Sequence, residues 1–211
     1  GNGGGFVVVP ALVFVFSILA DPTSDLIFVA IGTSLATIVI SSARSVIAHR
    51  ARGAVDFDVV KSWAPWLLLG VGVGLYLASF ARPNQLYSVF AGGVLVYSIY
   101  FLFPKALSNM SFSDTMPTGV TRASIASVLG GFSALLGIGG GTPTVITMVA
   151  CSRPIYQAVA TASGVGFIIG LGGAIGFLIL GLGKAGLPVG SIGYINAVSY
   201  THLRAHETVR N

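Results

Sequence analysis

The chain has 211 residues, of which 54% are hydrophobic and only 8% are charged, and its formal net charge is +5. A soluble domain carries about 25% charged residues, so these charges are too few to cover a water-facing surface, and much of the surface must face lipid. The basic residues lie in short loops between apolar segments rather than in one patch, which argues against a nucleic-acid-binding surface.

Apolar segments follow one another along the chain and predict an all-α fold, a polytopic bundle of transmembrane helices. The segments that are long enough, or nearly long enough, to span a bilayer are residues 26–48, 63–80, 86–103 and 158–182. Shorter segments occupy residues 7–20, 123–136 and 142–150, and residues 192–198 look like the start of another span. The sequence therefore predicts a multi-pass protein of the cell membrane, with the lipid bilayer as a partner.

The charges of the loops predict how these helices are oriented. The loops at residues 49–61 and 104–122 are basic, whereas the tight turn at Asn84 has only Arg82 beside it. Cytoplasmic loops of membrane proteins carry an excess of Lys and Arg. We therefore place the two basic loops in the cytoplasm and Asn84 on the opposite side of the membrane.

Two glycine clusters, each followed by a helix that carries Thr and Ser, indicate an internal repeat. GNGGGFVVVP at residues 1–10 is matched by GIGGGTPTVI at residues 137–146, and AIGTSLA at residues 30–36 is matched by AVATASG at residues 158–164. We therefore assign residues 1–120 to a first transmembrane repeat and residues 121–198 to a second. Many secondary transporters are built from two such halves. The sequence leaves open whether the halves are parallel or inverted.

The two repeats are not equally complete. The first has no helix before its glycine cluster, and the second lacks the last two spans of the first, so a complete protein is expected to have about eight spans. The tail at residues 199–211 is no longer apolar, and VSYTHLRAHET at residues 198–208 looks like one reading frame of a transposase adapter used to prepare sequencing libraries. We interpret the tail as non-native and leave it out of the fold.

The glycine clusters at residues 3–5 and 139–141 predict breaks in membrane helices. Each glycine inside a helix costs about 0.8–1.0 kcal/mol relative to alanine, and free backbone groups are tolerated at membrane depth only where they face protein or a wet cavity. The breaks should lie inside the bundle, with half-helices beginning near Phe6 and Thr142. Helix N-termini favour anions, so each break is a candidate anion site. The alternative is that the glycines only allow helices to pack closely.

The combination of these motifs resembles the sulfite exporter TauE/SafE family of permeases. GNGGGFVVVP, AIGTSLA and HRARG (residues 49–53) carry the resemblance in the first half, and GIGGGTP carries it in the second. The resemblance covers residues 1–198, with departures at Asn2 and Ile146. It implies a permease that moves sulfite, organosulfonates or related sulfur anions across the bacterial inner membrane.

An anion at mid-membrane depth needs donors that replace its hydration shell, and the chain offers backbone N–H groups at the breaks together with short hydroxyls. The candidate substrate-binding residues are Gly3, Gly4, Gly5, Thr33, Ser34, Gly139, Gly140, Gly141, Thr142, Thr161 and Ser163. We expect no cofactor and no metal site, because Cys151 is the only cysteine and His49 is the only histidine outside the tail.

Three functions compete for this pattern. A secondary transporter of small anions fits the repeat and the breaks best, and a passive anion channel or a structural membrane subunit is the alternative. An intramembrane enzyme is less favoured, because it would need a nucleophile with a base, or a metal cluster, at membrane depth. The exact substrate, the direction of transport, the coupling ion and the formation of a homo-oligomer are left open by the sequence.

Overall fold

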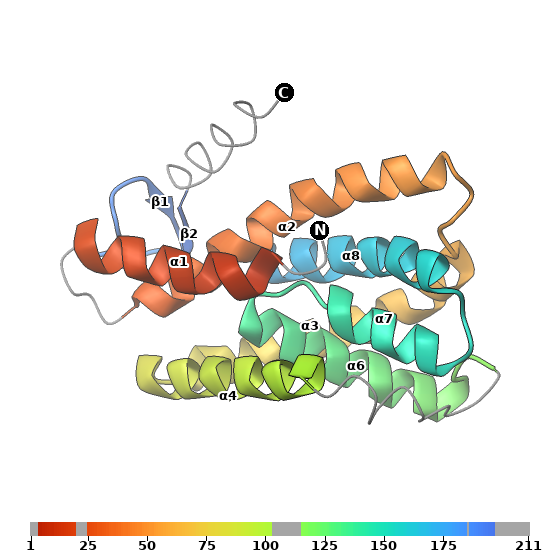
Figure 1. Ribbon diagram of the computed structural model, residues 1–211. Coiled ribbons are helices and arrows are strands. Elements are labelled where there is room, and N and C mark those ends of the chain that lie inside the picture. Colours follow the sequence, from red (N-terminus) through yellow and green to blue (C-terminus); the bar gives the residue numbers. More distant parts are fainter. Residues whose placement is uncertain (1–3, 20–24, 103–114, 185, 197–211) are drawn as a thin grey trace.

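The computed structural model describes residues 4–19, 25–102, 115–184 and 186–196, which form a bundle of seven helices and one short hairpin (Figure 1). The helices are α1 (Gly4–Leu19), α2 (Leu26–Arg50), α3 (Phe57–Phe80), α4 (Pro83–Leu102), α6 (Gly119–Leu136), α7 (Gly141–Ala150) and α8 (Ile155–Gly181). The strands β1 (Ser191–Ile192) and β2 (Ile195–Asn196) pair antiparallel. The tail interpreted as non-native lies outside the described residues, so that interpretation stays a prediction.

Four of the described helices, α2, α3, α6 and α8, are long and apolar enough to cross a membrane. Large apolar side chains such as Leu69, Val128 and Ile179 are exposed on their outer surfaces, where lipid would cover them. The expected all-α, multi-pass architecture is therefore confirmed. Helix α4 has 20 residues, and its crossing of the membrane stays a prediction.

The last expected span is wrong in its described part. Residues 191–196 form the β1–β2 hairpin instead of the start of a helix. Gly190 and Gly193 have φ of 83° and 57°, and such left-handed backbone turns the chain rather than continuing it as a helix. The hairpin is fixed to α8, because the N–H of Tyr194 donates to the carbonyl of Phe177 at 3.3 Å.

Helices α2 and α8 form an antiparallel pair. The Cβ position of Gly173 lies 2.8 Å from Leu35, and that of Gly166 lies 3.1 Å from the Oγ of Ser42. Residue numbers therefore fall along α2 as they rise along α8. Glycines on α8 let the two helices approach closely, as small residues commonly do in membranes.

Helices α3 and α6 pack in parallel, with backbone against backbone. A Cβ on Gly70 would meet the carbonyl oxygen of Ser127, and one on Gly74 would lie 2.7 Å from that of Gly131. The hydroxyl of Ser127 also donates to the carbonyl of Trp66 at 3.1 Å. This contact joins a helix of the first predicted repeat to a helix of the second.

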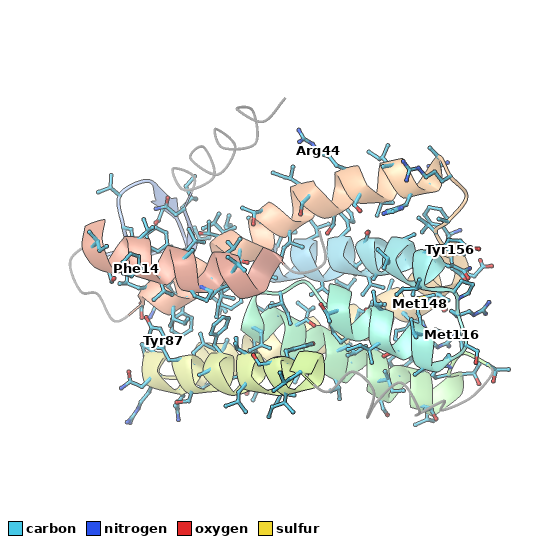
Figure 2. All side chains as sticks on the ribbon, viewed as in Figure 1. Phe14, Arg44, Tyr87, Met116, Met148 and Tyr156 are labelled. Atoms are coloured by element: carbon cyan, nitrogen blue, oxygen red, sulfur yellow. The ribbon has the colours of Figure 1, made fainter. Side chains whose placement is uncertain are left out.

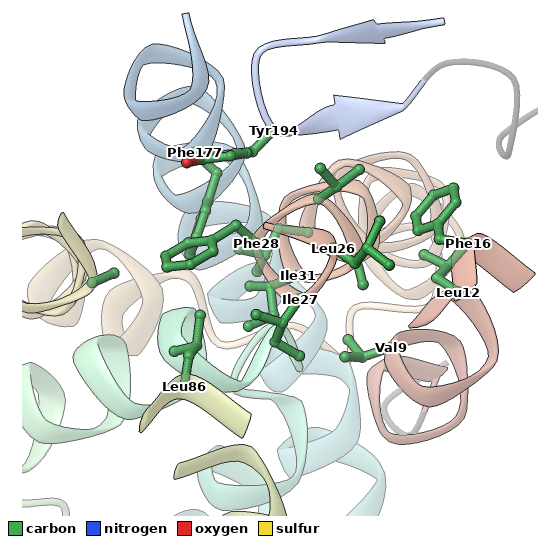
Figure 3. Packing of buried hydrophobic residues seen from close by; sticks show 14 of the residues in the cluster. Val9, Leu12, Phe16, Leu26, Ile27, Phe28, Ile31, Leu86, Phe177 and Tyr194 are labelled. Atoms are coloured by element: carbon green, nitrogen blue, oxygen red, sulfur yellow. The ribbon is translucent and has the colours of Figure 1, made fainter. Parts of the chain in front are cut away.

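The largest apolar cluster lies where α1 packs against the first half of α2 (Figure 3). Val9, Leu12 and Phe16 line one face of α1, and Leu26 and Ile27 lie on α2; all five are at most 6% exposed. Their spacing of three to four residues on α1 gives one apolar stripe. This stripe fixes α1 along the half of α2 that begins at Asp25.

Candidate functional site

The break between α6 and α7 is formed by glycines in left-handed backbone conformation. Gly137, Gly139 and Gly140 have φ of 67°, 66° and 68°, which residues with a Cβ rarely adopt. The N–H of Gly137 donates to the carbonyl of Ala134 at 3.3 Å and ends α6. Helix α7 begins at Gly141, one residue before the expected start. The second glycine cluster therefore breaks the helix, as the sequence predicts.

The N-terminus of α7 presents backbone donors to the interior of the bundle. The first N–H groups of any helix, here those of Gly140 and Gly141, have no acceptor within the helix, and Pro143 has no N–H at all. The carbonyl of Gly140 is occupied, because the hydroxyl of Thr144 donates to it at 2.7 Å. The first turn contains no acidic residue. The partial positive charge of this N-terminus is therefore not offset by a carboxylate within its own turn.

This N-terminus lies near the middle of the bundle. Gly139 packs against Ile38, the central residue of the 25-residue α2. Helix α7 has 10 residues and so extends about 15 Å, roughly half the thickness of a bilayer core. It runs back toward the end of the bundle where α6 begins, and Figure 2 shows Met116, Met148 and Tyr156 together at that end. Helices α6 and α7 thus form a hairpin, with the start of α6 and the end of α7 at the same end of the bundle.

The residues around the break are mostly apolar, and Ser34 makes a hydrogen bond to it. Cβ positions on Gly137 and Gly139 lie 3.1 Å from Val9 and 2.7 Å from Ile38, and one on Gly140 would meet Ile169. From α2, the hydroxyl of Ser34 donates to the carbonyl of Gly137 at 2.8 Å and is fully buried. The structure therefore brings Ser34 together with the predicted glycines, and Thr142 follows them in the first turn of α7.

A second buried serine lies at the break and is not among the residues predicted from the sequence. Ser133 on α6 is 0% exposed, and its Oγ has no hydrogen-bond partner among the described residues. This Oγ lies 3.2 Å from the Cβ position of Gly140. Its position in the last turn before the cluster was the available signal, but serine is common in membrane helices for packing reasons alone.

The remaining predicted hydroxyls lie elsewhere along the α2–α8 pair. The Oγ1 of Thr33 accepts the N–H of Asn196, and the Oγ1 of Thr161 accepts the N–H of Asp56, both at 2.9 Å. The hydroxyl of Ser163 lies 2.9 Å from that of Ser45.

Ser45 is twelve residues along α2 from Thr33, which corresponds to about 18 Å. One small anion cannot contact Thr33 and Ser163 together in this conformation. Their role as ligands stays a prediction.

The first glycine cluster is only partly described. Gly3 lies outside the described residues, whereas Gly4 and Gly5 open α1 as its first two residues. The helix thus begins two residues earlier than expected at Phe6. Figure 1 shows α1 running from the middle of the bundle toward the end where α2 begins, opposite to the direction of α7.

A separate polar hollow lies where α2 begins and α8 ends. It has a volume of about 110 Å³ and contains Asp25, Ser79, Lys184 and Tyr194 among its lining residues. The hydroxyl of Tyr194 donates to the carboxylate of Asp25 at 3.1 Å, and its ring stacks on Phe28. Burial raises the pKa of Tyr194, and the negative charge of Asp25 and the hydrogen bond to it raise this pKa further. Among the described residues, no three His, Cys, Asp or Glu side chains are placed to hold a metal ion.

Comparison with known proteins places this arrangement in a family. Residues 1–200 match the family model described as sulfite exporter TauE/SafE. The chain belongs to the sulfite exporter TauE/SafE family.

Curated relatives of this TauE/SafE protein are named as probable membrane transporter proteins. One from Haemophilus influenzae is 31% identical over 92% of this chain and 73% of its own length. Others from Methanocaldococcus jannaschii and Bacillus subtilis are 26% and 29% identical, over 91% and 86% of this chain and 73% and 72% of their own lengths. No solved structure matches the chain.

Membership of the TauE/SafE family confirms that the protein is a multi-pass membrane transporter and not an enzyme. The buried hydroxyls and glycines are therefore candidates for groups that bind or position a transported substrate. Arg44, the basic residue farthest from the ends of α2, is exposed and points away from the bundle in Figure 2. It is placed to reach the lipid headgroups rather than the break.

Proposed function

We propose that the protein carries small sulfur-containing anions, such as sulfite or organosulfonates, across the bacterial inner membrane. We further propose that the anion binds at the N-terminus of α7, beside Gly139, Gly140, Gly141, Thr142 and Ser34. The observation that carries this proposal is the buried α7 N-terminus near the centre of the bundle. Helix N-termini bind anions through free N–H groups and the helix dipole, and broken helices hold the substrate in this way in other transporters.

The family supports the substrate class in this proposal. The family description names sulfite, and sulfite and sulfonates share a small anionic group of oxygens around one sulfur. Such a group accepts several hydrogen bonds at once, which suits converging N–H and O–H donors.

Two features support an inverted arrangement of two repeats, which we also propose. Helices α2 and α8, which carry the matched motifs, run antiparallel. Their matched residues Thr33 and Thr161 each accept an N–H from the segment that follows the other helix, namely from Asn196 and Asp56. The same exchange at both ends of the pair is what a two-fold axis in the membrane plane would produce. Under this arrangement Gly3, Gly4 and Gly5 would supply the opposing half of the anion site.

This arrangement favours a carrier over a passive channel or a structural subunit. Helices α1 and α7 extend from the middle of the bundle toward opposite ends (Figure 1), so each half can open the same central site to one side. A rocking motion of one repeat against the other then gives alternating access. Thr33 and Thr161, at the two ends of α2–α8, are proposed to contact the anion only as it enters or leaves.

Transport of radiolabelled sulfite by the full-length protein in proteoliposomes tests this function. We expect saturable uptake, and we expect unlabelled sulfite inside the vesicles to accelerate entry of the label, because a carrier exchanges substrate across one site. Uptake that rises linearly with concentration and lacks this exchange would instead indicate a channel. Absence of flux for sulfite and for methanesulfonate would refute transport of sulfur anions.

A further inference from the structure

Ser133 has the position and the unmet hydrogen-bonding capacity of a substrate ligand. Its side chain is 0% exposed, and its Oγ has no partner among the described residues. Serine in a helix commonly donates to a carbonyl one turn earlier, as Thr144 and Thr147 do in α7. Ser133 does not use this option. A buried hydroxyl without a protein partner is unfavourable, so the Oγ of Ser133 is available to donate to a ligand.

The direction of this hydroxyl identifies where that group would bind. The Oγ of Ser133 lies 3.2 Å from the point where Gly140 would carry a Cβ, so it faces the residue that precedes α7. The free N–H groups of Gly140 and Gly141 lie at this same N-terminus of α7. Two independent features, an open helix N-terminus and an unpaired buried hydroxyl, therefore meet at one point.

We propose that Ser133 donates a hydrogen bond to the anion bound at the N-terminus of α7, and that this site selects singly charged oxyanions over doubly charged ones. The inference rests on the proposed anion transport and adds to it a ligand and a substrate class. Ser133 would contact one oxygen of the anion, while the N–H groups of Gly140 and Gly141 contact another.

The preference for a single charge follows from the composition of the site. The side chains closest to Gly137, Gly139 and Gly140 are those of Val9, Ile31, Ile38, Ile169 and Ser133, which carry no charge. The cost of moving an ion out of water rises steeply with its charge. Neutral hydroxyl and N–H donors compensate this cost for one negative charge far better than for two. Sulfonates and hydrogen sulfite therefore fit the site, whereas sulfate does not.

Anion-dependent stabilisation of the purified full-length protein tests the inference. Methanesulfonate serves as the singly charged probe and sulfate as the doubly charged one, and the midpoint of thermal unfolding is measured against the concentration of each. Binding to the folded state raises this midpoint. We expect methanesulfonate to stabilise the wild-type protein and sulfate to have a much smaller effect at equal ionic strength.

The decisive variant is Ser133→Ala, compared with Ser127→Ala on the same helix. Ser127 donates to the carbonyl of Trp66, so its loss should lower the midpoint without anion and leave the affinity for methanesulfonate unchanged. Ser133→Ala removes a hydroxyl that has no partner, so the midpoint without anion should stay the same or rise. Its affinity for methanesulfonate should fall about ten-fold or more, as expected for losing a hydrogen bond to a charged group.

The outcomes separate this inference from the proposed function. If Ser133→Ala keeps the wild-type affinity, or loses stability without anion as Ser127→Ala does, the hydroxyl belongs to the fold and the inference is wrong, whereas anion transport still stands. Equal stabilisation by sulfate would refute the charge preference. If neither probe nor sulfite stabilises the wild-type protein, and none of them is transported by it, the proposed anion transport is wrong. The proposed role of Ser133 is then wrong as well.

Discussion

The hydroxyl of Thr33 on α2 accepts a hydrogen bond from the backbone N–H of Asn196 in β2, with 2.9 Å between oxygen and nitrogen. Both residues are buried, at 1% and 2% exposure. This contact joins the hairpin after α8 to α2. Loss of an acceptor for a buried N–H costs about 1–3 kcal/mol, so the contact contributes measurably to stability.

Thr33→Val keeps the shape of the side chain and removes this acceptor. We expect the free energy of unfolding to fall by about 1–3 kcal/mol, measured as a lower midpoint of thermal or denaturant unfolding. We also predict that Thr33 and Thr161 bind the passing anion. The double variant Thr33→Val and Thr161→Val should therefore bind sulfite more weakly. Unchanged affinity at wild-type expression would assign both hydroxyls to the fold alone. Thr37→Val is a matched control on α2, since its hydroxyl donates only to Ser34 of its own helix.

Tyr194 should make stability depend on alkaline pH. Burial, then Asp25, raises its pKa above the ordinary value, so the folded state favours the neutral phenol. This contribution is complete below the unfolded-state pKa of about 10 and is lost as pH rises above it, because the unfolded state then gains by ionising. We expect Tyr194→Phe to be less stable near neutral pH, and its stability to decline less steeply above about pH 10.

A comparison of unfolding midpoints across alkaline pH checks this expectation. The phenylalanine retains the ring that stacks on Phe28, so the difference isolates the hydroxyl and its bond to Asp25. Tyr156→Phe, at a position 67% exposed, is the control for general effects of losing a tyrosine. Parallel pH profiles for wild type and Tyr194→Phe would show that this hydroxyl does not couple stability to pH.

The orientation of the bundle can be tested with two single cysteines. Positions 52 and 84 lie at opposite ends of α3 and are both exposed. Arg52→Cys is preferable to Gly53→Cys, because Gly53 has φ of 65°. In a Cys151→Ala background, we expect a membrane-impermeant maleimide to label position 84 from outside the cell and position 52 only after the membrane is opened. Labelling of both positions in intact cells would contradict the span assigned to α3.

The native Cys151 should itself react slowly with the maleimide. It is 3% exposed, and burial raises the pKa of its thiol, although the charge of Arg153 lowers it. Since the thiolate is the reactive form, the wild-type protein should label slowly. Fast labelling of the wild type would show that the turn after α7 opens readily.

Two glycines of α3 should respond in opposite ways to alanine. A Cβ on Gly70 would meet the backbone oxygen of Ser127, whereas nothing lies within 4 Å of a Cβ on Gly72. We expect Gly70→Ala to destabilise the protein by about 1–3 kcal/mol through overpacking, and Gly72→Ala to be neutral or stabilising because alanine favours the helix. Unfolding midpoints in detergent measure both. Equal effects would contradict the close α3–α6 contact.

The limits of a helix were predictable where charged residues lie at the ends of an apolar segment, and less so elsewhere. Helix α2 lies within two residues of its expected bounds, with Asp25 before its first residue and the basic His49 and Arg50 in its last turn. Helix α3 begins at Phe57, six residues before the apolar run at 63, because the carboxylate of Asp56 accepts the N–H of Val59 at 3.1 Å and caps a polar first turn. Hydropathy alone does not register such a cap.

The site was predictable in its backbone but not in its side chains. Three glycines in a membrane segment are enough to predict a break. Thr33 and Ser34 are adjacent in sequence, yet successive residues of a helix point about 100° apart. Ser34 therefore reaches the break while Thr33 reaches Asn196. That choice depends on which helices surround α2, and this information is absent from a local motif.

The short length of α7 also has a consequence for how the protein is made. A segment of 10 residues is too short to cross a bilayer by itself, so α7 needs its neighbouring helices to hold it at membrane depth. The buried carbonyl of Gly137 accepts a hydrogen bond from Ser34, and α8, which is synthesised later, places Ile169 against Gly140. The break can therefore reach its final form only after α8 has been synthesised and has packed against it.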